Sequence, residues 1–78
     1  MQAFNQGQIV VSDFSGLERQ MYQIRNDDIK KMNDLIKSGE TAIILEISYD
    51  DDRKNCWLKI LTRMGIIGYV PSIWMKSV

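Results

Sequence analysis

The chain has 78 residues, ten of them basic and ten acidic, with one cysteine and no histidine. That length suffices for one domain with one hydrophobic core. A single thiol excludes an intramolecular disulfide, and the lack of histidine excludes serine–histidine and cysteine–histidine catalytic pairs and histidine-bearing zinc sites. The zero formal net charge removes the bulk attraction that most nucleic-acid and anionic-membrane binders use.

No targeting segment is predicted. Residues 1–8 contain neither a basic stretch nor an apolar one, and every apolar run is far shorter than the roughly 20 residues that a membrane helix needs. We therefore expect a cytoplasmic protein without membrane contact.

The first quarter of the chain is expected to begin with a strand. Residues 7–12 are rich in β-branched side chains and lie between a glycine and Ser12-Asp13, which predicts a short strand. The spacing of Ser15-Gly16-Leu17-Glu18 is that of a capping box, which would begin a short helix. Residues 17–24 fit an extended arm equally well, so both interpretations stay open.

A helix is predicted at about residues 26–38. Asn26 is a good N-cap, acidic residues follow it in the first turn, and Gly39 is a stop signal. The apolar residues between them recur at helical spacing and would form one stripe: Ile29, Met32, Leu35 and Ile36.

The remainder of the chain is predicted to be a succession of strands. The β-prone residues 41–47 indicate a central strand, and a charged loop at 49–55 follows it. The other expected elements are a strand at 57–62, a turn at 63–65, a returning strand at 66–70, a 3₁₀ turn at 71–74 and a short strand at 75–78.

Three motifs in this order resemble the Src-homology-3 family and its bacterial relatives. They are Lys37-Ser38-Gly39-Glu40, Trp57-Leu58-Lys59-Ile60 and Gly68-Tyr69-Val70-Pro71-Ser72. The resemblance covers about half of the chain and implies a mainly β fold. We expect residues 1–78 to form a single five-stranded Src-homology-3-like barrel, with the helix inserted between the first and second strands.

The resemblance also implies a binding surface. In eukaryotic members an aromatic groove docks proline-rich peptides in the polyproline II conformation. It implies Pro71 for the groove proline and Trp74 for the aromatic residue after it. The groove tryptophan corresponds to Trp57 if the hairpin is one residue longer, or to Cys56 in an ungapped count from Gly65. Ile73 stands where the family usually has an asparagine.

A second resemblance concerns the origin of the chain. Residues 7–11 and residues 65–70 look like the two ends of small barrels that are frequent among proteins of tailed bacteriophages. If the chain is phage-encoded, its expected location is the host cytoplasm or the virion.

The residues that could form a catalytic or metal site are better explained by structural roles. Cys56 inside an apolar strand is expected to be a small hydrophobe. The carboxylates at 50–52 lack the alternating spacing of a calcium loop and indicate a solvated turn. Asp27 and Asp28 are explained by the electrostatics of a helix start. We predict no enzyme, no metal and no cofactor.

The predicted function is non-enzymatic binding of a protein partner of unknown identity, as an adaptor or regulator. The residues expected to bind it are Trp57, Pro71, Trp74, Tyr69 and Tyr49. One alternative is nucleic-acid binding by Lys30, Lys31, Arg53 and Lys54, with aromatic platforms such as Tyr22. A second alternative is a structural part of a virion or larger assembly, and homo-oligomerisation stays open.

Overall fold

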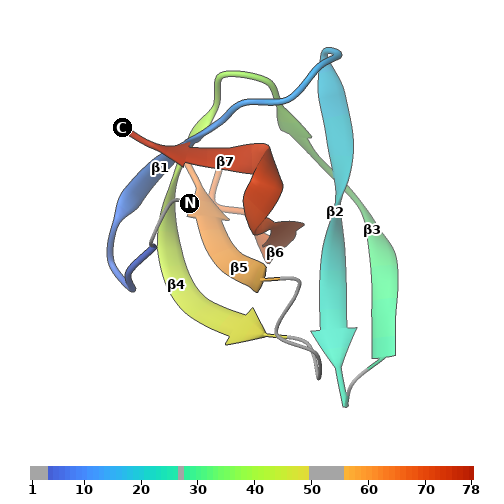
Figure 1. Ribbon diagram of the computed structural model, residues 1–78. Helices are drawn as coiled ribbons and strands as arrows, with labels where there is room; N and C mark the ends of the chain where they lie inside the picture. The colour runs from blue at the N-terminus through green and yellow to red at the C-terminus, as the bar shows by residue number, and fades with distance from the viewer. Residues whose placement is uncertain (1–3, 27, 50–55) are drawn as a thin grey trace.

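A computed structural model describes residues 4–26, 28–49 and 56–78. These residues form seven β-strands and one 3₁₀ turn, and no α-helix occurs among them (Figure 1). The elements are β1 (Ile9–Ser12), β2 (Glu18–Arg25), β3 (Asp28–Lys37), β4 (Thr41–Tyr49), β5 (Cys56–Thr62), β6 (Ile67–Pro71), η1 (Ser72–Trp74) and β7 (Met75–Ser77).

All seven strands belong to one antiparallel sheet with the order β3-β2-β6-β5-β4-β1-β7. The sheet curls, so that the β2–β3 hairpin stands beside the β4–β5–β6 meander, and β1 and β7 continue the sheet beyond β4 (Figure 1). Among the described residues no pairing joins the edge strands β3 and β7, so the hydrogen-bonded ladder is open. Within this part of the chain, no helix is both long and apolar enough to cross a membrane.

The predicted strands of the second half are confirmed with small changes of boundary. β4 extends two residues beyond the predicted end, and β5 and β6 pair from Trp57↔Pro71 to Leu61↔Ile67. The 3₁₀ turn follows Pro71, and the last strand returns to pair with β1. The predicted charged loop falls at residues 50–55, outside the described residues, except for Tyr49 at the end of β4.

The predicted helix at about 26–38 is wrong, because Asp28–Lys37 form β3, the second arm of a hairpin. β3 pairs with β2 from Arg25↔Asp28 to Glu18↔Lys37, with one irregularity between Gln20 and Tyr22. Of the expected helical stripe only Ile36 is fully buried, whereas Ile29 and Leu35 are 46% and 40% exposed. An isolated helix of this length is marginal in water, and the ladder with β2 supplies the backbone partners instead.

Asn26 turns the hairpin and does not cap a helix. Its φ of 51° lies in the left-handed region, which asparagine tolerates better than most residues. Arg25 and Asp28 lie opposite each other, so the connection has the two-residue length that favours positive φ at its first position. The two strands that this hairpin adds explain why the sheet has seven strands where five were predicted.

The turn between β3 and β4 is tied to the end of β1 through a buried serine. The Ser12 hydroxyl donates to the carbonyl oxygen of Lys37 and accepts from the Glu40 N–H at 2.9 Å. The Gly39 N–H donates to the Ser12 carbonyl oxygen at 3.0 Å, and Gly39 has a φ of 82°. The sequence motif Lys37–Glu40 therefore closes the base of the hairpin against the first strand.

The hydrophobic core collects side chains from all seven strands. Among the described residues nine hydrophobic ones are buried, and they form one cluster: Val10, Met21, Ile36, Ala42, Ile44, Leu58, Ile60, Val70 and Met75. Met21 and Ile36 come from the two arms of the hairpin. The hairpin therefore shares the core of the other strands and is not a solvent-exposed extension.

The hairpin approaches β6 closely at Gly68. A Cβ atom added there would lie 2.9 Å from Met21 Cε, 2.9 Å from Met32 Sδ and 3.3 Å from Met21 Cβ. Met32 packs against the buried cluster. The absence of a side chain at residue 68 therefore allows both methionines to cover β6.

We predict that Gly68→Ala lowers the free energy of unfolding by about 1–3 kcal/mol, the usual cost of overpacking. Urea denaturation measures it. The cost should be smaller in a Met32→Ala background, because the Sδ atom that the new methyl group meets is then gone. Equal costs in the two backgrounds would contradict the close packing described above.

A second prediction concerns the hairpin turn. Asn26→Val should destabilise the chain by about 1–2 kcal/mol, because a β-branched residue is strained at positive φ, whereas Asn26→Gly should have little effect. Gln23→Val on the exposed side of β2 is the matched control and should also be tolerated. Thermal melting of the three variants measures these effects. A melting temperature of Asn26→Val equal to that of the control would refute the assignment of Asn26 to the turn.

Candidate partner-binding site

Four aromatic side chains form a continuous cluster on one surface. Tyr22 lies between the two tryptophans, with its ring centroid 5.2 Å from that of Trp57 and 6.1 Å from that of Trp74. Phe14 meets Trp74 edge to face at 5.7 Å. All four residues are half-buried, and Phe14 and Trp74 also pack against the hydrophobic core. We call Phe14, Tyr22, Trp57 and Trp74 the aromatic cluster.

Strand register explains how these residues meet. Trp57 lies near the start of β5, directly opposite Pro71 at the end of β6. Trp74 ends the 3₁₀ turn that Pro71 precedes, and the Asp13 N–H donates to the Trp74 carbonyl oxygen at 2.7 Å. Tyr22 arrives from the hairpin, where it pairs with Tyr69 of β6. The cluster thus joins residues from the loop before β2, from β2 itself, from β5 and from the 3₁₀ turn.

One cation lies on the cluster. The guanidinium carbon of Arg19 is 4.7 Å from the ring centroid of Phe14 and 5.1 Å from that of Trp74. Its Nη2 atom donates to the carbonyl oxygen of Ser15 at 3.3 Å and to the hydroxyl at 3.4 Å. Contacts of a guanidinium with aromatic faces are worth about 0.5–1 kcal/mol at exposed sites, so the two rings and the contacts with Ser15 together position Arg19.

The structure brings together three of the five predicted partner-binding residues. Trp57, Pro71 and Trp74 lie at the cluster. Tyr69 is half-buried beside it and lines a depression of about 270 Å³ with Tyr22. Tyr49 is 63% exposed and pairs with Cys56. Adjacent strand residues point to opposite faces, so Tyr49 does not share the face of Trp57.

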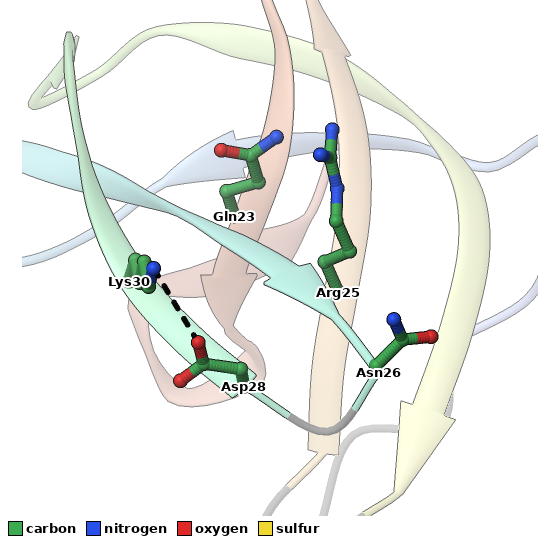
Figure 2. A pocket seen from close by; sticks show the side chains of 5 residues that line it. All are labelled: Gln23, Arg25, Asn26, Asp28 and Lys30. Carbon is green, nitrogen blue, oxygen red and sulfur yellow. Dashed lines mark ion pairs between the residues drawn. The ribbon is translucent and has the colours of Figure 1, made fainter.

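Lys30 and Lys31 do not lie together on one surface, as they would have done on the predicted helix. Lys30 and Lys31 are neighbours in a strand, so their side chains point to opposite faces. Lys30 Nζ lies 3.5 Å from the carboxylate of Asp28 beside a polar depression of about 280 Å³ at the hairpin tip (Figure 2). Arg53 and Lys54 lie outside the described residues.

The acidic residues considered as candidate catalytic groups or metal ligands, Asp27, Asp28 and residues 50–52, do not form a metal site within the described part of the chain. Asp28 pairs with Lys30, while Asp27 and residues 50–52 lie outside the described residues. Among the residues that the structure describes, no group of three carboxylates or cysteines could hold a metal ion.

Cys56 lies at the start of β5 and packs against the hydrophobic core while remaining half-buried. Burial raises the pKa of its thiol, and a hydrogen bond with Ser72 acts in the opposite direction. The raised pKa keeps the thiol protonated near neutral pH, which is the form that does not act as a nucleophile. Cys56 therefore fits the role of a small core residue.

Comparisons with protein-family models, curated proteins and solved structures found no match for the chain. The functional interpretation rests on the arrangement of the residues themselves. That arrangement consists of half-exposed aromatic rings from distant segments, a proline beside them and one cation stacked on them.

Sequence reasoning missed two residues of this surface and gave a third another role. Phe14 and Arg19 were not singled out, and Tyr22 was considered only as a platform for nucleic-acid bases. Strand alternation over residues 17–24 could have revealed part of the answer, because it places Met21 and Tyr22 on opposite faces. The contacts of Phe14 and Arg19 with Trp74 have no counterpart in the local sequence.

Cys56 should react slowly with iodoacetamide at neutral pH. Because the pKa of the thiol is raised, the rate should increase with pH and reach its plateau at a higher pH than free cysteine does. Mass spectrometry of the native chain over a pH series measures these rates, with the urea-unfolded chain as the control. A plateau at or below that of free cysteine would contradict the assignment.

Proposed function

We propose that the chain is a Src-homology-3-like barrel that acts as a non-enzymatic protein-binding module. The order of the elements supports this architecture: a first strand, a long hairpin, a three-stranded meander, a 3₁₀ turn and a last strand that pairs with the first. The shared core of all seven strands supports it as well. In this proposal the β2–β3 hairpin takes the place between the first strand and the meander where a helix was predicted.

The aromatic cluster is the observation that carries the proposed binding function. Large aromatic side chains dominate binding energy at protein interfaces, because they supply much contact area with few rotatable bonds. Trp57 and Trp74 are half-buried, so they are held by packing and still present ring surface. Pro71 lies opposite Trp57 and extends the apolar surface.

The nucleic-acid alternative receives less support from the described residues. Binding of a phosphate backbone requires several cations along one track. Lys30 and Lys59 each lie within 4 Å of a carboxylate oxygen, and Lys31 points to the opposite face from Lys30. A protein partner needs no such track.

We predict that Trp57→Ala and Trp74→Ala each weaken partner binding by about tenfold or more, the effect of losing an aromatic hot spot. Affinity capture and mass spectrometry would first identify the partner, and titration with the purified partner would then give the dissociation constants. Circular dichroism checks that each variant is folded.

Met64→Ala is the matched control, because Met64 is an apolar residue that is 79% exposed in the turn between β5 and β6. It should bind the partner as the native chain does. Unchanged binding by both folded tryptophan variants would refute the proposed surface. Salt-sensitive binding of generic oligonucleotides would favour the nucleic-acid alternative, and self-association in sedimentation would favour a structural role.

A further inference from the structure

Arg19 gives the aromatic cluster a chemical preference. Resting on the proposed function, we infer that the cluster binds an acidic, extended segment of a partner protein, with the guanidinium of Arg19 receiving an aspartate or glutamate side chain. The apolar part of the segment then lies on Trp74, Tyr22 and Trp57.

The first argument is that the charge of Arg19 is not balanced locally. Among the described residues, Lys30, Lys59 and Lys76 each have a carboxylate oxygen within 4 Å, whereas Arg19 has none. The guanidinium has five N–H donors, and within this part of the chain only Nη2 is used, in two contacts of 3.3 and 3.4 Å.

The second argument is that the guanidinium is already positioned. Phe14 and Trp74 contact it at 4.7 and 5.1 Å, and stacking on rings leaves the N–H groups at the edge of the plane accessible. An arginine fork of this kind matches the two oxygens of a carboxylate. Because the rings hold the side chain, less conformational freedom is lost on binding than for a free surface arginine.

The spacing of the cluster defines the expected segment. Tyr22 lies 5.2 Å from Trp57 and 6.1 Å from Trp74, so the two indoles are at most about 11 Å apart, which an extended chain covers in about three residues. Arg19 contacts only the Trp74 end. The partner segment should therefore carry its acidic residue about three or four positions from a bulky apolar residue that reaches Trp57.

A guanidinium also fits a phosphate, so a single-stranded nucleic acid is the competing occupant. It is disfavoured because Arg19 is one cation at one end of the cluster, and the neighbouring Lys59 lies 3.9 Å from Glu46. Among the described residues no second cation is stacked on the rings of the cluster, whereas one carboxylate on a peptide requires only one guanidinium.

A displayed library of random nine-residue peptides, selected on the immobilised chain, tests the inference. Selected peptides should carry aspartate or glutamate at the stated spacing from an apolar residue. Replacing that acid by its amide should weaken binding by about tenfold or more, as expected for a charge-assisted hydrogen bond. Arg19→Gln should cause a similar loss.

Reversing the charge of Arg19 is the decisive experiment. Arg19→Glu should reject the acidic peptides and bind the same peptides with lysine in place of the acid. Arg25→Glu is the matched control, because Arg25 is an exposed arginine of the same strand at the hairpin tip, and it should keep the native preference. Thermal melting checks that the variants fold.

The outcomes separate this inference from the function on which it rests. Peptides that depend on Trp57 and Trp74 but show no acidic preference, or no response to Arg19→Glu, would overturn the inference alone. If no selected peptide binds more weakly to the Trp57→Ala and Trp74→Ala variants, the proposed binding surface is wrong, and the inference is wrong with it. Tighter binding of a single-stranded oligonucleotide that competes with the selected peptides would overturn the inference in favour of nucleic acid.

Discussion

The close packing of the β2–β3 hairpin on β6 at Gly68 is the constraint on which the rest of the structure depends. Both methionines that cover this position, Met21 and Met32, occupy space that a single methyl group at residue 68 would fill. Met21 is completely buried at this contact. Methionine is well suited to such a contact, since its unbranched side chain fits irregular spaces. The hairpin would otherwise be a two-stranded ribbon, which is marginally stable on its own in water.

The same contact creates the aromatic cluster. Neighbouring residues of a strand point to opposite faces, so the burial of Met21 in the core directs Tyr22 to the outer surface. There Tyr22 meets Trp57 of β5 and Trp74 of the 3₁₀ turn. Core packing and the proposed binding surface are therefore two sides of one strand. A change that lifts the hairpin from Gly68 would disturb the surface as well as the fold, and this coupling is why variants of the surface need an independent measure of folding.

The sequence predicted the strands of the second half because their signals are local. β-branched and apolar residues are dense in residues 41–47 and 57–62, and glycine and proline mark the ends of the following strand. The helix at 26–38 was wrong for an equally physical reason. Ile29, Met32, Leu35 and Ile36 fit a helical stripe, yet two of them stay largely exposed in the hairpin. Spacing within one segment contains no information about a pairing partner such as β2.

What the sequence determined by itself is the mainly β character of the chain and the meander of its second half, with the 3₁₀ turn after Pro71. That Trp57, Pro71 and Trp74 bind a partner stays a prediction. The sequence also determined the lack of histidine and of a second thiol. Only the tertiary structure decided that residues 18–37 form a hairpin and that Phe14, Arg19 and Tyr22 join the tryptophans. The physical reason is that the contacts with Trp57 and Trp74 connect residues far apart in the chain, and that the hairpin bearing Arg19 and Tyr22 is placed by its packing on β6 at Gly68.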